Sequence, residues 1–136
     1  MNLRLKLTAI GITLVLMLSG FWVTQSPPTQ EIHTLEVIKI NNIWKVVNAA
    51  DSSYVVKVKL NDKIEWTAVG TNALFEFHND LFDSTAVNYS KYIKDGKKLN
   101  LKIKSNAKKG TYIYSVFCTP DSVYAIGGSP PKIIVE

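Results

Sequence analysis

From residue 31 onward, hydrophobic and polar positions alternate in short runs that are separated by turn-forming residues. Alternation with a period of two places every second side chain on the same face of a β-strand, whereas a helix requires apolar residues every three to four positions over a longer stretch. No long run with helical spacing follows residue 31. The pattern therefore predicts an all-β domain over residues 34–136, organised as a Greek-key sandwich of about seven strands.

The clearest alternation predicts which side chains face the core. Three sets of alternating apolar residues each share one face of a strand: Val56, Val58 and Leu60; Ile64, Trp66 and Ala68; Leu99, Leu101 and Ile103. The predicted strands are 35–40, 43–47, 54–60, 63–69, 73–77, 99–104, one through Tyr112, and 132–136. Asn41 and Asn42 suit a tight turn because both tolerate left-handed backbone. The mixed stretch 78–98 is expected to hold one helical turn.

The N-terminus has a different pattern. Arg4 and Lys6 precede an apolar run, residues 7–23, which is typical of an export segment and is also at the short end of what crosses a bilayer. We predict that residues 1–26 are a signal peptide or a membrane anchor, a choice that the sequence leaves open. Residues 27–33 are expected to form a linker with a stiff proline pair. The domain is therefore expected to be extracytoplasmic, periplasmic or secreted.

The net charge of +5 comes largely from one region. Eight lysines lie between residues 91 and 109, with only Asp95 to offset them: Lys91, Lys94, Lys97, Lys98, Lys102, Lys104, Lys108 and Lys109. Lysine without arginine lacks the bidentate geometry that reads phosphate, so nucleic acid is not an expected partner. Exposed lysines on strands also keep sheet edges soluble, and we favour that interpretation.

The chain has a single cysteine, Cys118, so an internal disulfide is excluded. No histidine with an acidic or amide partner can be assigned to activate it as a nucleophile. Cys118 is in phase with Tyr112, Tyr114 and Val116, which predicts that it packs inward as a small apolar group. The chain is therefore not expected to be an enzyme.

Residues 110–136, GTYIYSVFCTPDSVYAIGGSPPKIIVE, resemble the C-terminal part of cupredoxins, the small blue-copper β-sandwich proteins. In that family a strand of the form G-x-Y-x-Y ends in a ligand cysteine, and a histidine and a methionine follow before a final strand. Cys118 corresponds to the thiolate. The segment LNDKIEWT, in which a turn introduces the strand bearing Trp66, is a second point of resemblance.

The resemblance implies a copper site, but most of its ligands are replaced here. The place of the first histidine falls at Ala73 or Leu74, that of the second at Asp121, and that of the axial methionine close to Ile126. Blue copper requires two imidazoles, a thiolate and a weak axial sulfur. The remaining metal candidates, none of them favoured, are Cys118, His78 and Asp121. His78 lies at the end of strand 73–77 and reaches the site only if the loop there is rearranged, and His33 is expected to be solvated.

We therefore expect an exported, non-enzymatic, cupredoxin-like binding or structural module with a degenerate copper site and no cofactor. Its working surface is expected in the loops 118–131, where exposed aromatic residues suit a protein partner, and its N-terminal segment is expected to contact the membrane. The alternative is a mononuclear copper protein for electron transfer or copper delivery that uses Cys118 and His78. A third possibility is a subunit of a membrane complex.

Overall fold

The computed structural model describes residues 25–83, 85–127 and 130–136. The predicted export or anchor segment, residues 7–23, lies outside these ranges. Within them, no helix has the length and apolar character needed to cross a membrane.

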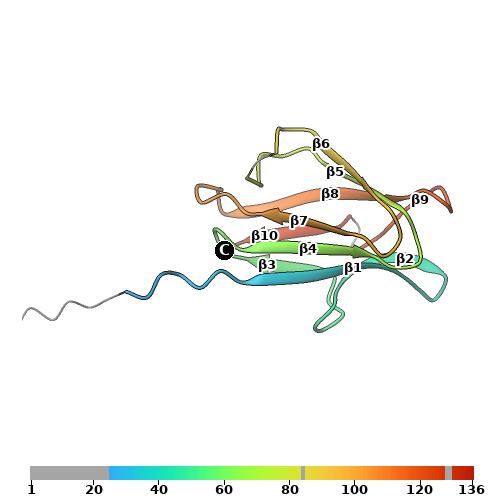
Figure 1. Cartoon of the computed structure of the whole chain (residues 1–136), viewed down its shortest axis with the longest axis horizontal. Coiled ribbons are helices and arrows are strands. Elements are labelled where there is room, and N and C mark those ends of the chain that lie inside the picture. The colour runs from blue at the N-terminus through green and yellow to red at the C-terminus, as the bar shows by residue number, and fades with distance from the viewer. Residues whose placement is uncertain (1–24, 84, 128–129) are drawn as a thin grey trace, which may run out of the picture.

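The described chain folds into two β-sheets that pack face to face (Figure 1). The first sheet has the order β2-β1-β4-β7, with β1 (Ile32–Ile40), β2 (Ile43–Asn48), β4 (Lys63–Ala68) and β7 (Lys98–Lys102). The second has the order β3-β10-β8-β5-β6, with β9 added beside β8; its strands are β3 (Val55–Val58), β5 (Ala73–Phe77), β6 (Tyr89–Ile93), β8 (Gly110–Cys118), β9 (Val123–Tyr124) and β10 (Lys132–Val135).

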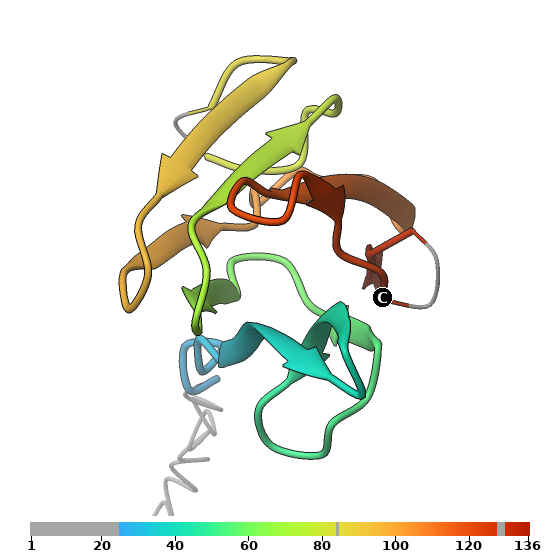
Figure 2. The same ribbon diagram turned by 90° about the vertical axis from the view of Figure 1, so that its right-hand side faces the viewer.

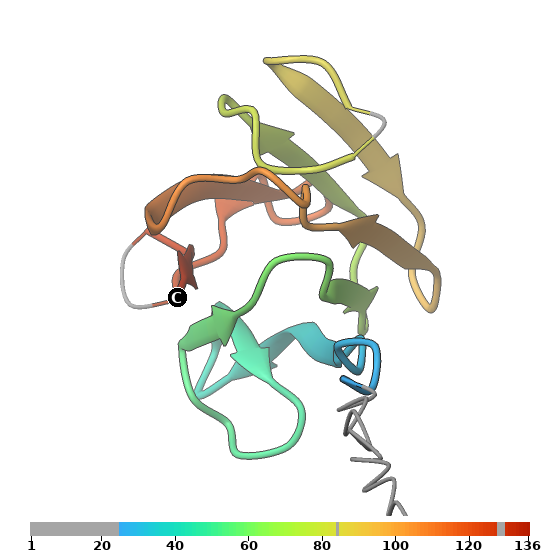
Figure 3. The same ribbon diagram turned by 90° about the vertical axis from the view of Figure 1, so that its left-hand side faces the viewer.

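Strand pairing combines antiparallel neighbours with two parallel pairs, β1 with β4 and β10 with β3. The chain passes repeatedly from one sheet to the other, and end-on views show the two layers clearly (Figures 2 and 3). The predicted all-β Greek-key sandwich is thus confirmed. The parallel pairs arise because the chain passes through the opposite sheet between the two strands of a pair. The second strand can then run in the same direction as the first.

The first hairpin forms as its turn residues predict. Asn41 and Asn42 adopt φ values of 50° and 64°, and β1 pairs with β2 from Leu35 opposite Asn48 to Ile40 opposite Ile43. A two-residue turn with both φ angles positive matches the twist of the flanking strands. The hairpin brings Lys39 directly opposite Trp44.

The core between the sheets is centred on Trp66, which is fully buried. Its indole packs against aromatic rings at centroid distances of 5.5 to 5.9 Å, those of Phe75, Phe77, Phe82 and Tyr114. The indole N–H donates to the hydroxyl of Tyr114 at 3.0 Å, so the one polar atom of Trp66 is satisfied inside the core. Buried Trp requires such a partner.

Two of the predictions about the strands of the sandwich are wrong. The stretch 78–98 contains strand β6 rather than a helical turn in its described part. β6 is an edge strand, and Lys91 pairs with the buried Phe75, which puts the lysine on the core side of the strand and disrupts the apolar alternation. Lys91 is itself exposed, as are Ser90 and Tyr92, and a charge at this position protects the sheet edge from pairing with another chain.

The second error concerns Leu60, which is 39% exposed. Strand β3 ends at Val58, because the backbone then turns: Asp62 N–H donates to the Lys59 carbonyl and Asn61 has a φ of 70°. The alternation therefore stops before it reaches Leu60. At the N-terminus, β1 begins at Ile32, inside the segment predicted as linker.

Candidate functional site

Cys118 is the last residue of β8 and is fully buried. It lies between Ala73 of β5 and Val123 of β9, its two cross-strand partners. Burial raises the pKa of the thiol, and a hydrogen bond with the Thr71 side chain only partly opposes that effect. A buried thiol of raised pKa is a poor nucleophile.

Neither residue at the place of the first family histidine can bind metal. Ala73 faces the core beside Cys118 and carries only a methyl group. Leu74 pairs with Phe117 and, by the alternation of the strand, points to the outer face of the sheet. The position facing the thiol therefore offers no donor atom.

His78 lies at the opposite end of β5 from Cys118. Ala73 is opposite Cys118, and Phe77 is opposite Tyr114, so His78 is five residues further along the strand. At about 3.4 Å per residue the separation is roughly 17 Å, far beyond the reach of two ligands of one metal. His78 is exposed and hydrogen-bonds the Asn88 side chain at 3.1 Å. The structure does not bring His78 and Cys118 together.

Asp121 follows β8 at the same end as Cys118, and other groups already occupy its carboxylate. The oxygen Oδ2 accepts hydrogen bonds from Lys39 Nζ at 2.7 Å and from Trp44 Nε1 at 2.6 Å. The bond from Lys39, then that from Trp44, lower the pKa of Asp121. Lys39 Nζ also lies over the Trp44 ring, 5.2 Å from its centroid. We call Lys39, Trp44 and Asp121 the Asp121 cluster.

The β1–β2 hairpin positions this cluster. Leu35 and Val37 point into the core, so Lys39, two residues further on, lies on the same face at the strand end. Trp44 is 7% exposed and packs within reach of Gly70. The cluster therefore closes the end of the sandwich beside the thiol with an indole and an ion pair.

Ile126, close to the place of the axial methionine, is held by its backbone. Its carbonyl accepts from Val46 N–H at 2.8 Å, and its own N–H donates to the Trp44 carbonyl at 2.9 Å. These bonds join the segment after β9 to β2. A methyl group on the next residue, Gly127, would lie 2.9 Å from the Val46 carbonyl oxygen, so this close contact requires glycine. The residues present therefore do not fit a blue-copper centre.

Beside the cluster, several apolar side chains are exposed. Val123 is 43%, Tyr124 59% and Ile126 40% exposed, and Phe117 packs edge-to-face against Tyr124 with ring centroids 5.0 Å apart. All four belong to β8, β9 and the residue pair that follows (Figure 2). Phe117 pairs with Tyr124 and Cys118 pairs with Val123, so Phe117 and Tyr124 share the outer face of the β8–β9 pair and Val123 lies on the other face. These exposed residues lie within the segment where the sequence predicted a working surface.

The lysine-rich region is partly neutralised. Three of its eight lysines form ion pairs: Lys98 with Glu65 at 2.6 Å, Lys102 with Asp83 at 3.7 Å, and Lys104 with Asp80. The first two lysines lie on β7, an edge strand. This arrangement agrees with charges that keep a sheet edge soluble.

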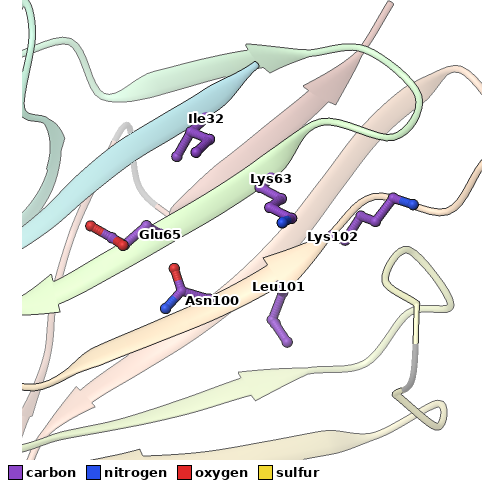
Figure 4. A pocket seen from close by; sticks show the side chains of 6 residues that line it. All are labelled: Ile32, Lys63, Glu65, Asn100, Leu101 and Lys102. Atoms are coloured by element: carbon purple, nitrogen blue, oxygen red, sulfur yellow. The ribbon is translucent and has the colours of Figure 1, made fainter. Parts of the chain in front are cut away.

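A groove of about 270 Å³ runs along the outer face of the first sheet, next to this edge (Figure 4). It crosses β1, β4 and β7 and is lined by Ile32, Lys63, Glu65, Asn100, Leu101 and Lys102. Its one carboxylate, on Glu65, is paired with Lys98. The groove therefore places one exposed apolar side chain, that of Ile32, among charged and polar side chains.

His33 is not solvated, contrary to the sequence prediction. Its side chain is only 12% exposed, and Nε2 lies 2.9 Å from Oδ2 of Asp62. Burial raises the pKa of Asp62, but hydrogen bonds from Lys59 N–H, His33 and Glu31 N–H outweigh it and lower the pKa overall. Sequence reasoning missed this pair because its members are far apart in the chain. The one available signal was a carboxylate in the Asn61–Asp62 turn.

No family model and no curated protein matches the chain. Among solved structures it is similar to amicyanin variants. An oxidised proline-to-glycine variant shares 16% identity over 83% of this chain and 88% of that one, with a TM-score of 0.46. An oxidised methionine-to-leucine variant shares 18% identity over 76% and 80%, with a TM-score of 0.45. In the sandwich of this chain, the thiol lies at the end of β8, between β5 and β9.

Proposed function

We propose that this chain is an extracytoplasmic, non-enzymatic binding or structural module that keeps a cupredoxin-like frame and has lost the copper site. The strongest support is the state of Asp121. By the sequence resemblance, its carboxylate takes the place of a copper-binding imidazole, and it accepts hydrogen bonds from Lys39 and Trp44. A carboxylate oxygen is a hard ligand and is poorly suited to the copper of a blue-copper site. In this chain the oxygen is also already bonded to the ammonium group of Lys39 and the indole of Trp44.

The environment of the thiol supports the same proposal. Ala73 faces Cys118, so the first imidazole is missing, and the two histidines of the chain lie at the other end of the sandwich, near the start of β1 and the end of β5. A nucleophilic cysteine needs a neighbouring base or positive field that lowers its pKa, whereas the pKa of Cys118 is raised. A catalytic role for this thiol is accordingly disfavoured.

The proposed working surface is the segment 117–126, with the edge-to-face pair of Phe117 and Tyr124 and the exposed side chains of Val123 and Ile126. Clustered exposed apolar side chains on one edge of a small domain are typical of a protein interface. The N-terminal apolar segment would hold or deliver the domain at a membrane, where such a partner would be met. Cross-linking from Tyr124, with the exposed Ile32 at the opposite end of the sandwich as the control position, tests this part of the proposal.

The loss of copper is tested by adding Cu(II) to the full chain and to Cys118→Ser and recording visible spectra. A thiolate bound to copper gives an intense charge-transfer band. We expect the two spectra to be alike and to lack this band. An intense band in the unmodified chain that disappears in Cys118→Ser would overturn the proposal.

A further inference from the structure

Three side chains of types that can bind a metal ion meet at the end of the sandwich opposite Cys118. Glu31 precedes β1, His33 lies on β1, and Asp62 precedes β4. The parallel pairing of β1 with β4 places Ile32 opposite Lys63 and His33 opposite Ile64, which brings the beginnings of the two strands together. Figure 3 looks onto this end of the molecule.

All three side chains point to one face. Leu35 and Ile64 are buried in the core, so Glu31 and His33 on one strand, and Asp62 on the other, lie on the core side at its outer rim. Their closest ligand atoms, one from each residue, are all within 4.8 Å of one another. His33 and Asp62 are about thirty positions apart in the chain. They meet because the beginnings of β1 and β4 are neighbours in the sheet.

Asp62 is held in a fixed orientation. It is 3% exposed, and its Oδ1 accepts from Glu31 N–H at 3.1 Å while Oδ2 accepts from Lys59 N–H at 2.8 Å. Backbone donors that fix a carboxylate in this way act as the outer partners of metal ligands do in proteins. The remaining lone pairs of Oδ2 face His33 Nε2 at 2.9 Å.

Glu31 differs from Asp62 in that its carboxylate is exposed and takes part in no hydrogen bond or ion pair among the described residues. Only its backbone N–H and carbonyl are used, towards Asp62 and Lys63. The side chain is therefore able to turn towards the other two. Tetrahedral Zn²⁺ with bonds near 2.0 Å separates its ligand atoms by about 3.3 Å, so the His33–Asp62 separation needs to widen only slightly.

We propose that Glu31, His33 and Asp62 form a Zn²⁺ site, with water as the fourth ligand on the exposed side. One imidazole nitrogen and two carboxylate oxygens suit Zn²⁺, and the two negative charges balance the ion. The metal would replace the hydrogen bond between His33 and Asp62. It would tie residues 25–31, where the chain enters the sandwich, to the turn between β3 and β4. This site is independent of Cys118 and of the proposed function.

The test titrates the full chain, in detergent, with Zn²⁺ against a chromogenic chelator, and with Co²⁺ as a spectroscopic probe. We expect one Zn²⁺ per chain, a raised Tm, and the comparatively intense visible d–d bands of tetrahedral Co²⁺ without a thiolate charge-transfer band. Glu31→Gln is the most informative variant, because the Glu31 side chain makes none of the bonds that orient Asp62. It should weaken Zn²⁺ binding by about tenfold or more, while leaving the Tm of the metal-free chain unchanged.

Two matched controls separate this site from others. His78→Ala removes the second histidine at a distant position and should leave Zn²⁺ affinity unchanged, as should Cys118→Ser. No uptake of Zn²⁺ by the unmodified chain would overturn the proposal, as would equal losses in Glu31→Gln and His78→Ala. A Co²⁺–thiolate charge-transfer band would also overturn it and would instead place the metal at Cys118.

Discussion

Ala73 lies directly opposite Cys118 in the antiparallel pair of β5 and β8. A methyl group thus occupies the cross-strand position nearest to the thiol, and His78 is carried to the far end of the same strand. In this register, no side chain of β5 that faces the thiol carries a metal-binding atom. The sandwich places a cysteine at a strand end, but the neighbouring positions supply packing and an ion pair.

The first prediction concerns the reactivity of Cys118. Because the thiol is fully buried and its pKa is raised by burial, a thiol reagent should react slowly with the folded chain at about pH 8 and rapidly once the chain is unfolded. The rate should increase as pH rises past the ordinary cysteine range. Labelling of native and denatured protein over a pH series provides the measurement, and equal rates in both states would contradict the burial.

The second prediction concerns acid stability. The folded-state pKa of Asp121 is lowered from 3.8 by its bonds from Lys39 and Trp44. Its contribution to stability is therefore present above the unfolded pKa and is lost as pH falls through the folded pKa. Asp121→Asn should be less stable than the unmodified chain at neutral pH, and the difference should shrink below about pH 4. Urea unfolding at several pH values tests this; a gap that persists unchanged in acid would argue against it.

The third prediction concerns the core hydrogen bond between Trp66 and Tyr114. Tyr114→Phe leaves the buried indole N–H without an acceptor and should lower the free energy of unfolding by about 1–3 kcal/mol. Tyr112→Phe is the matched control, because its hydroxyl donates to the Lys108 carbonyl at an exposed position. That change should cost less than about 1 kcal/mol. Denaturant unfolding of both variants should rank them in this order.

The fourth prediction concerns Gly127. Gly127→Ala places a methyl group 2.9 Å from the Val46 carbonyl oxygen and should lower the free energy of unfolding by about 1–3 kcal/mol. It should also reduce hydrogen-exchange protection of the Val46 amide, which is bonded to Ile126. Gly96→Ala is a useful control: nothing lies within 4 Å of the added methyl, although φ is +72°. Loss of protection at Val46 in the control variant as well would show that the close contact is not the cause.

The strands could be predicted from the sequence where one face of the strand is buried and the other is exposed to solvent, because apolar and polar residues then alternate. β5 was predicted with its exact observed bounds, and the inward positions Ile64, Trp66 and Ala68 are all fully buried. β6 was missed because Lys91 stands on its core side. A strand is recognised from the alternation of apolar and polar residues. This method fails for an edge strand in which a charged residue interrupts the apolar face and protects the edge from pairing with another chain.

The site was predictable only in its local part. The burial of Cys118 follows from its phase with Tyr114 and Val116. The partners of Asp121 are 82 and 77 residues away in the chain, and His33 is 29 residues from Asp62. No local pattern specifies such contacts, because they arise only when the sheets assemble and strand register is set.

The most direct test of the central claim compares the unmodified chain with the double variant Ala73→His, Asp121→His. Both positions flank Cys118, so the variant supplies two imidazoles beside the thiolate, the donor set that copper requires. After addition of Cu(II), the account predicts an intense thiolate-to-copper band in the double variant and none in the unmodified chain. The same band in the unmodified chain would contradict the claim that this sandwich has lost its copper site.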